Sequence, residues 1–279
     1  PYGTWIIREI ESPKGYVLSE EEIAVTIGKV DEVVEIELVN YFIKGNIALT
    51  KVDEDYPDNK LSGAVFEVYS DTNGDGKLDK DDTLLGEMKE LDGGVYQMSE
   101  LRYGKYLVKE TKAPTGFVLD ENVYSVSVEE NGKTYTVENK AGVGFINAAQ
   151  KGSLKIVKTS SDGKVEGFSF RVTGVDYDQT FKTDKNGEIV IEGLRIGDYT
   201  VSEVSDKASA GYILPADKQA TVKVDATAIV QMHNEFRDTP KTGDDFNLGL
   251  WVSLAALSVV GAGVLGFVGY KNRKKKKED

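Results

Sequence analysis

The chain contains no cysteine and only one histidine among its 279 residues. Without cysteine no disulfide can cross-link its domains, so their stability must come from another source. The same scarcities argue against a Cys/His or Ser/His/Asp catalytic set, since the one histidine stands alone. His233 lies beside Asn234 and falls on the opposite strand face, which predicts a solvent-exposed side chain.

Basic residues are scarce except at one end of the chain. The formal net charge is −13, and the dense cluster of Lys and Arg lies in residues 271–277. This distribution argues against nucleic-acid binding and favours a soluble, self-repelling chain. The sequence also starts at Pro1 with neither an initiator Met nor a signal peptide, so we expect it to be the C-terminal part of a longer secreted protein.

One long apolar run is present, at residues 248–270. As a helix it would rise roughly 34 Å, enough to cross the hydrocarbon of a bilayer. Because Lys and Arg crowd only its far side, the tail of residues 271–279 is predicted to be cytoplasmic and residues 1–247 extracellular.

A short motif precedes that run, within the linker of residues 238–247. It reads Thr239-Pro240-Lys241-Thr242-Gly243 and is followed by an acidic pair. The order of motif, span and basic tail resembles the cell-wall sorting signal of Gram-positive surface proteins, although that signal has Leu where this chain has Thr239. The resemblance implies that a sortase cuts between Thr242 and Gly243 and joins the Thr242 carboxyl group to a peptidoglycan amine. The span would then be transient and the mature protein would lie in the cell wall. The alternative is an ordinary tail anchor with a chance motif.

The extracellular part repeats itself at roughly 90 to 110 residues, which indicates tandem domains rather than a solenoid. For example, Gly45-Asn-Ile-Ala-Leu-Thr-Lys51 matches Gly152-Ser-Leu-Lys-Ile-Val-Lys158 without a gap. We therefore divide this part into module 1 (residues 1–44), which is the C-terminal part of a truncated domain, module 2 (45–151) and module 3 (152–237).

Short alternating runs between Gly, Asn and Asp turns, with no helical period before the span, predict an all-β fold of tandem Ig-like β-sandwiches. In module 1, strands are expected around residues 5–9, 23–27 and 34–38. Linkers between modules are nearly absent, so the array should form a stiff rod followed by one C-terminal transmembrane helix.

Polar residues of three types fall on the core side of the predicted strands of module 2. Lys51 stands two residues after Leu49 and Glu110 two residues after Val108, so each shares a strand face with that apolar residue. Asn147 shares the parity of Phe145. A buried Lys, Glu or Asn alone would cost several kcal/mol, so the three must satisfy one another. The matching residues of module 3 are Lys158, Glu203 and Asn234.

This combination of residue types is chemically reactive. Burial lowers the pKa of a lysine and raises the pKa of a glutamate, so both groups would be neutral. A neutral Lys amine can attack the Asn side-chain carbonyl while the Glu polarises that carbonyl and helps ammonia to leave. The product is an amide bond between two strands. The alternative is a set of solvated strand-end charges with an interstrand hydrogen bond.

The turn Thr-Lys-Ala-Pro-Thr-Gly-Phe that follows Glu110 completes a resemblance to Cna B-type (SpaA-like) domains, which have a prealbumin-like fold. The resemblance covers nearly all of residues 1–237, although the segment after Glu203 departs from this turn. It implies that Glu110 and Glu203 catalyse isopeptide bonds between the following pairs: Lys51 with Asn147, and Lys158 with Asn234. Module 1 keeps Glu9 and Asn40 but has no equivalent lysine strand.

One insertion in module 2 carries a separate pattern, at residues 71–82. Oxygen donors stand at positions 1, 3, 5, 9 and 12 of this segment, with Gly at position 6 and an aliphatic residue at position 8, which is the pattern of an EF-hand loop. The last donor is Asp where the usual loop has Glu, so weak Ca²⁺ binding in the extracellular range is expected. The alternative is an acidic, Gly-rich surface loop. The predicted ligands are Asp71, Asn73, Asp75, the backbone oxygen of Lys77, Asp79 and Asp82.

Together these features predict the stalk and wall anchor of a Gram-positive surface adhesin. Sortase and peptidoglycan are the expected partners, and a host or surface ligand would bind domains upstream of Pro1. Two alternatives stay open: a basal or minor pilin of a sortase-assembled pilus, and the tether of a wall-associated enzyme whose catalytic head lies upstream. Because each isopeptide bond forms once and processes no substrate, the chain is not expected to be an enzyme.

Overall fold

The computed structural model describes residues 2–237, and this part of the chain consists of strands, turns and loops without a helix. The prediction of an all-β fold is therefore confirmed for these residues. Between residues 2 and 237 there is accordingly no helix that could cross a membrane. The predicted sorting motif, membrane span and basic tail lie outside the described residues.

Module 1 contains one antiparallel pair of strands, β1 (Gly3–Arg8) and β2 (Glu22–Ile27). Residues 34–38, predicted to form a third strand, run without a ladder partner in the described part of the chain, and Val34 is 42% exposed. The prediction was wrong here because a strand is defined by its inter-strand hydrogen bonds, and alternation of apolar residues does not supply them.

Module 2 is a sandwich of two sheets. The first has the order β10-β3-β7-β6, with β11 also paired to β3, and the second has the order β5-β4-β8-β9. The strands are β3 (Lys44–Asp53), β4 (Val65–Ser70), β5 (Thr83–Glu87), β6 (Lys89–Glu90), β7 (Val95–Arg102), β8 (Gly104–Lys112), β9 (Val123–Val128), β10 (Thr134–Thr136) and β11 (Phe145–Asn147).

Module 3 repeats this plan, with sheets β15-β12-β19-β17 and β14-β13-β16-β18. Its strands are β12 (Lys151–Ser160), β13 (Ser169–Gly174), β14 (Tyr177–Lys182), β15 (Glu188–Arg195), β16 (Gly197–Val204), β17 (Tyr212–Ile213), β18 (Lys218–Val222) and β19 (Thr227–Phe236).

Each complete module closes its own hydrophobic core. The core of module 2 includes Ile47, Leu49, Phe66, Tyr96 and Phe145. The core of module 3 includes Leu154, Ile156, Phe170, Tyr199 and Met232. Neither core contains a residue of the other module or of module 1. Modules 2 and 3 therefore each have the separate core that an independently folding domain needs.

The first and last strands of each complete module are parallel neighbours. In module 3, β19 pairs along the length of β12. In module 2, the corresponding last strand is divided into β10 and β11, which pair with successive parts of β3. A covalent bond between these neighbours would join the two ends of a module directly.

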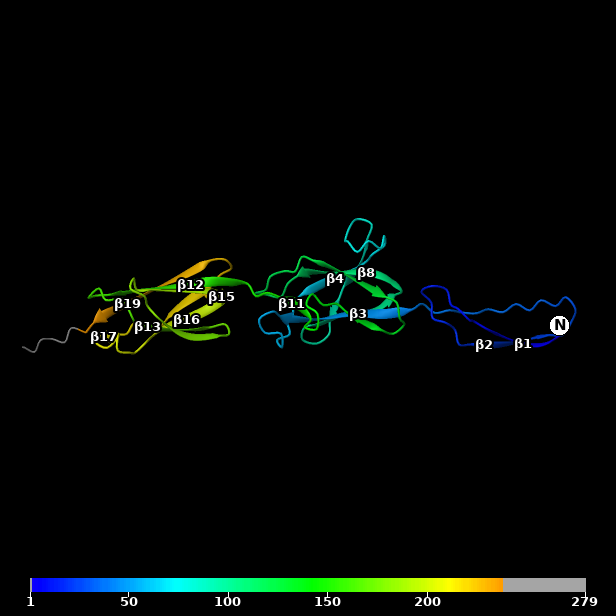
Figure 1. Cartoon of the computed structure of the whole chain (residues 1–279), viewed down its shortest axis with the longest axis horizontal. Coiled ribbons are helices and arrows are strands. Elements are labelled where there is room, and N and C mark those ends of the chain that lie inside the picture. The colour runs from blue at the N-terminus through cyan, green and yellow to red at the C-terminus, as the bar shows by residue number, and fades with distance from the viewer. Residues whose placement is uncertain (1, 238–279) are drawn as a thin grey trace, which may run out of the picture.

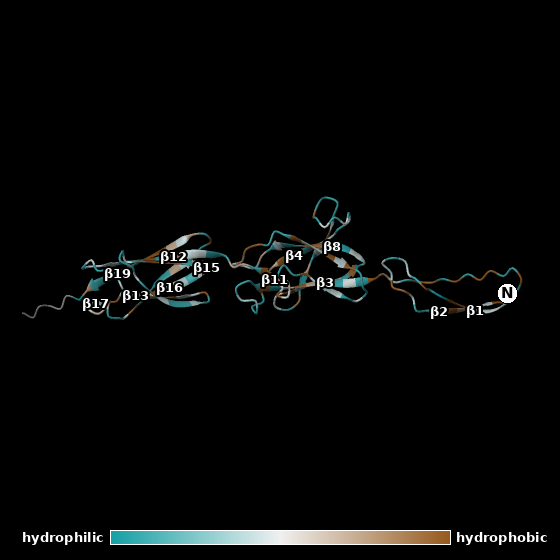
Figure 2. Ribbon diagram, viewed as in Figure 1, coloured by the Kyte–Doolittle hydropathy of each residue, from teal (hydrophilic) through white to brown (hydrophobic). Residues whose placement is uncertain are grey.

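The modules follow one another along the long axis of the molecule (Figure 1). β11 ends at Asn147 and β12 begins at Lys151, so the linker is as short as predicted. Arg195 of module 3 reaches back across this junction and forms a two-pronged ion pair with Asp53 of module 2, with N···O distances of 2.7 and 2.8 Å. Hydrophilic and apolar colours both occur along the strands of the two sandwiches (Figure 2).

Candidate functional site

The predicted polar residues of module 2 meet inside its sandwich. Lys51 on β3 and Glu110 on β8 are both 0% exposed, and Asn147 on β11 is 3% exposed. Burial alternates along β3, with Ile47 and Leu49 on the same inner face as Lys51. The lysine therefore points inward because it continues an apolar stripe, as its parity predicted.

Strand register places the lysine and the asparagine side by side in both modules. Phe145 is the register partner of Lys51, so Asn147 lies one same-face step further along β11. In module 3 the partner of Lys158 is Met232, and Asn234 lies the same step beyond it on β19. Diagonal neighbours on adjacent strands are roughly 7–8 Å apart between their backbones, a distance that a lysine side chain can span.

Hydrogen bonds in module 2 already connect two of the three residues. Asn147 Nδ2 donates to Glu110 Oε1 at 3.0 Å and to Oε2 at 2.9 Å. Lys51 Nζ donates to the backbone oxygen of Phe145 at 2.9 Å and lies 5.4 Å from the centre of that ring. The carbonyl oxygen of Asn147 is buried without a partner. This oxygen is therefore free to accept a hydrogen bond.

Module 3 presents the same arrangement with fewer contacts. Asn234 Nδ2 donates to Glu203 Oε1 at 2.6 Å, whereas Glu203 Oε2 and Asn234 Oδ1 are buried without partners. Lys158 Nζ donates to the backbone oxygen of Thr159 at 2.5 Å and stands 4.2 Å above the ring of Phe168. The amine thus faces an apolar wall rather than solvent.

The electrostatic setting favours neutral lysines and glutamates. Burial lowers the pKa of Lys51 to about 8 although Glu110 opposes the shift, and burial also lowers the pKa of Lys158. Burial raises the pKa of Glu110 and that of Glu203, against the hydrogen bonds from the asparagines. Among residues 2–237, neither lysine lies within ion-pair distance, 4.0 Å, of its glutamate. Burial therefore shifts both the lysine and the glutamate of each cluster toward their neutral forms, beside an asparagine amide.

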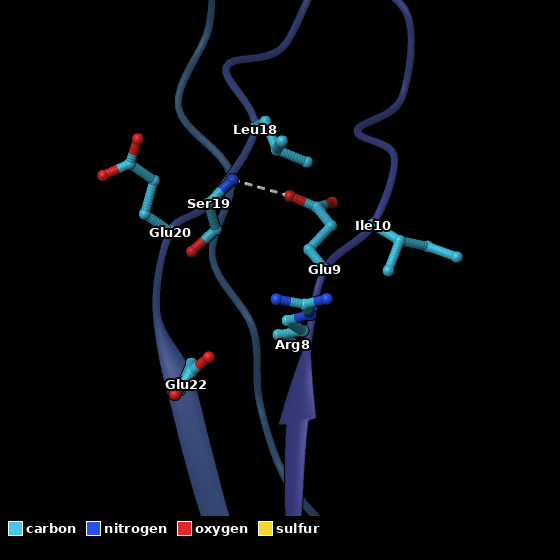
Figure 3. A pocket seen from close by; sticks show the side chains of 7 residues that line it. All are labelled: Arg8, Glu9, Ile10, Leu18, Ser19, Glu20 and Glu22. Atoms are coloured by element: carbon cyan, nitrogen blue, oxygen red, sulfur yellow. Dashed lines mark hydrogen bonds between the residues drawn. The ribbon is translucent and has the colours of Figure 1, made fainter.

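A loop amide that the sequence analysis did not identify supports two of the glutamates. The backbone N–H of Asp120 donates to Glu110 Oε2 at 2.8 Å. In module 1, the N–H of Ser19 donates to Glu9 Oε2 at 2.7 Å (Figure 3). Both donors stand ten residues after the glutamate. The gapless match between the segments that follow Glu9 and Glu110 is the signal that could have revealed them.

Module 1 retains only part of the arrangement. Asn40 Nδ2 donates to Glu9 Oε1 at 2.7 Å and to Oε2 at 2.9 Å, and both residues are half-buried. No lysine in the described part of the chain forms an ion pair with Glu9. Module 1 thus holds the Glu9–Asn40 pair just outside its strands, without the third residue.

The remaining predicted residues lie apart from these clusters. The loop of residues 71–82 joins β4 to β5, with Asp71 buried and Asn73, Asp75 and Asp79 exposed. His233 is exposed, as predicted, with 51% of its side chain accessible, and it contacts Thr159 and Glu235.

Several solved structures are similar to this chain. The TIE protein of Bacillus anthracis is 26% identical, with a TM-score of 0.65, over 85% of this chain and 42% of its own. A Streptococcal ancillary pilin is 19% identical, with a TM-score of 0.31, over 85% of this chain and 76% of its own. GBS52, the minor pilin of Streptococcus agalactiae, is 18% identical, with a TM-score of 0.32, over 71% of this chain and 98% of its own. The chain thus spans less than half the length of the TIE protein. No curated protein matches it.

The family match repeats along the chain. The SpaA family of prealbumin-like fold domains matches residues 1–41, 45–141 and 152–236, once in each module. Most of the sequence is therefore accounted for by three copies of one domain type, and the chain belongs to the SpaA family of prealbumin-like fold domains.

Proposed function

We propose that this chain is the stalk and wall anchor of a Gram-positive surface protein, with modules 2 and 3 each closed by an intramolecular Lys–Asn isopeptide bond. The observation that carries the proposal is the repetition of a buried Lys/Glu/Asn cluster at one strand register in two modules. Burying three polar groups in each core is costly unless they react or satisfy one another.

The proposed reaction in module 2 joins Lys51 to Asn147. With a pKa of about 8, roughly a tenth of the Lys51 amines are neutral at pH 7. The amine attacks Asn147 Cγ, while a half-turn of the amide brings the unpartnered Oδ1 onto the protonated Glu110. Glu110 then carries the amine proton to Nδ2. The Cγ–Nδ2 bond breaks, ammonia leaves, an Nζ–Cγ amide remains and Glu110 is regenerated. Glu203 performs these steps for Lys158 and Asn234.

Such a bond would carry tension directly from the first strand of a module to its last. Because β3 pairs with β11, and β12 with β19, force applied along the rod would pass through the amide and leave the remaining strands unloaded. A chain without cysteine thereby obtains the covalent closure that disulfides supply elsewhere. The bond forms once, so the module is a structural element and not an enzyme.

The motif at residues 239–243 supports the proposed anchoring. A sortase would cut after Thr242 and transfer its carboxyl group to peptidoglycan, which places modules 1–3 outside the membrane. A basal or minor pilin is the second candidate, because pilins are among the solved structures that are similar to this chain. In either assignment the modules are covalently stiffened spacers.

Peptide mass spectrometry tests the proposed bonds. A protease digest of purified residues 1–237 should yield a branched peptide that joins the β3 segment containing Lys51 to the segment containing Asn147, and a second that joins Lys158 to Asn234. The Asn147→Ala variant should lose only the first. Linear peptides with free lysines from folded protein would refute the proposal.

Wall digests of producing cells test the anchoring and separate the two candidates. Release of the chain with its C-terminus at Thr242 attached to a wall peptide supports sorting. A single anchored species indicates a monomeric stalk, whereas a ladder of covalent high-mass species indicates a pilus subunit.

A further inference from the structure

The loop between β4 and β5, residues 71–82, takes no part in the Lys/Glu/Asn clusters. This long, hydrophilic loop protrudes from the side of module 2 (Figures 1 and 2). Two glycines, Gly74 and Gly76, adopt φ values of 73° and 76°, which other residues rarely reach, so the chain can wrap tightly at this point.

The root of the loop holds a carboxylate oxygen with no partner. Asp71 is 6% exposed, and its Oδ1 atom is buried without a hydrogen bond. Its other oxygen accepts from the N–H of Gly76 at 3.1 Å, which turns the carboxylate into the loop. A buried, unpartnered carboxylate oxygen is strongly unfavourable unless a cation compensates it. No Lys or Arg of residues 2–237 forms an ion pair with Asp71.

Further side-chain oxygens of the loop accept hydrogen bonds from its own backbone. Asn73 Oδ1 accepts from the N–H of Asp75 at 3.0 Å, and Asp75 Oδ1 accepts from the N–H of Lys77 at 2.8 Å. Asp82, at the far end, accepts from the N–H of Thr72 at 3.1 Å, which closes the loop onto its start.

These carboxylates do not converge on one point by themselves. Within residues 2–237, no three His, Cys, Asp or Glu side chains form a ready-made metal-binding group. Because like charges at short range are unfavourable until a cation neutralises them, we expect these carboxylates to converge only when the ion binds. A cation would gather Asp75, Asp79 and Asp82 around the already buried Asp71.

We propose that the loop of residues 71–82 binds one Ca²⁺ ion, anchored by Asp71 Oδ1 and completed by side-chain oxygens of Asn73, Asp75, Asp79 and Asp82 and the backbone oxygen of Lys77. The donors are all hard oxygens of one loop, which suits the six to eight ligands of Ca²⁺ better than the strict octahedron of Mg²⁺. The affinity should lie on the order of 10⁻⁴ to 10⁻³ M, as in extracellular modules.

Binding would stiffen the edge of the sheet that also carries Glu110. The N–H of Asp71 donates to the backbone oxygen of Lys105 on β8 at 3.0 Å, and Lys105 Nζ donates to the backbone oxygen of Gly74 at 2.9 Å. The loop is thus fastened to β8 at both its buried root and its outer turn. Calcium ordering of the loop would therefore restrain β4 and β8 together.

Isothermal titration of residues 1–237 with CaCl₂, combined with amide hydrogen exchange, tests this site. The wild-type segment should bind one Ca²⁺, and exchange should slow within residues 71–82. Asp71→Asn should weaken binding at least about tenfold. Asp75→Asn, at an exposed position, should also weaken it, so the test does not depend on tolerance of a change at the buried site. Asp81→Asn removes the same charge from a position that supplies no ligand, and should change affinity less than about twofold.

Three results would overturn the proposal. The first is that folded protein does not bind at 10 mM Ca²⁺, which is roughly ten times the weakest expected dissociation constant. The second is that Asp81→Asn and Asp71→Asn weaken Ca²⁺ binding equally. The third is that the protein binds Mg²⁺ and Ca²⁺ with equal affinity. Equal weakening would mean diffuse attraction to an acidic loop. All variants should retain both isopeptide bonds, so failure here is distinguishable from failure of the proposed function.

Discussion

Modules 2 and 3 carry the same buried cluster but support its glutamate differently. Glu110 Oε2 accepts from the backbone N–H of Asp120, whereas Glu203 Oε2 is buried without a partner. The segment after Glu203 takes another course, in which Asp206 accepts from Ser169 and Ser209. Strand parity and register are identical in the two modules. The comparison indicates that register defines the cluster, while the loop amide adjusts how firmly the glutamate is held.

The largest expected effect is loss of a cross-link. Lys51→Met and Lys158→Met keep an apolar side chain of similar length but remove the amine. Each bond closes a loop of roughly 75 to 100 residues, so by analogy with disulfides each variant should lose about 4 to 5 kcal/mol of unfolding free energy. Urea unfolding measures this loss. If both variants unfold like the wild type, neither lysine is cross-linked.

The junction gives a second contrast between the modules. Arg195 forms an ion pair with Asp53, whereas Arg102, at the corresponding position of module 2, stacks 3.9 Å above the ring of Phe42. Arg195→Ala should cost about 3 kcal/mol because it leaves a buried carboxylate unpaired. Arg102→Ala, the matched control, should cost about 1 kcal/mol. Equal losses in urea unfolding would show that the ion pair adds no more than the stacking contact.

Removing the loop amide should make module 2 resemble module 3. Asp120→Pro deletes the N–H that positions Glu110, and Asp120→Ala keeps that N–H while removing the side chain. Because a hydrogen bond between neutral groups is worth roughly 1 kcal/mol, the Pro variant should form the bond about fivefold more slowly than the Ala variant. The rate can be followed as mass loss after refolding. Identical rates would exclude a role for the amide.

The smallest effect expected is a pH dependence of module 2 without its bond. In Asn147→Ala the lysine amine stays free, and burial holds the pKa of Lys51 at about 8, below its unfolded value near 10.4. Between these values the unfolded chain binds more protons, so stability rises with pH, by about 1 kcal/mol from pH 8 to 9. The Lys51→Met/Asn147→Ala double variant should lack this rise. A flat profile in both would contradict the shifted pKa.

Local patterns predicted much of the fold and the clusters. The alternation of apolar and polar residues predicted that Lys51 and Lys158 lie on inner strand faces, because side chains along a strand alternate with a strict period of two residues. It failed for residues 34–38, whose pairing depends on a neighbouring strand rather than on their own side chains. The contact between Arg195 and Asp53 joins residues 142 positions apart, so no local pattern reports it. The amide of Asp120 was also missed, because residue type does not identify a backbone donor, and only the gapless match between the segments after Glu9 and Glu110 indicates it.

The intact mass of purified residues 1–237 tests the central claim most directly. Each isopeptide bond expels one ammonia, about 17 Da. The account predicts a mass two ammonias below the value calculated from the sequence, and a deficit of one ammonia in Lys51→Met and in Lys158→Met, each compared with its own calculated mass. Folded protein with the full calculated mass would contradict the account, and the Lys/Glu/Asn clusters would then be noncovalent.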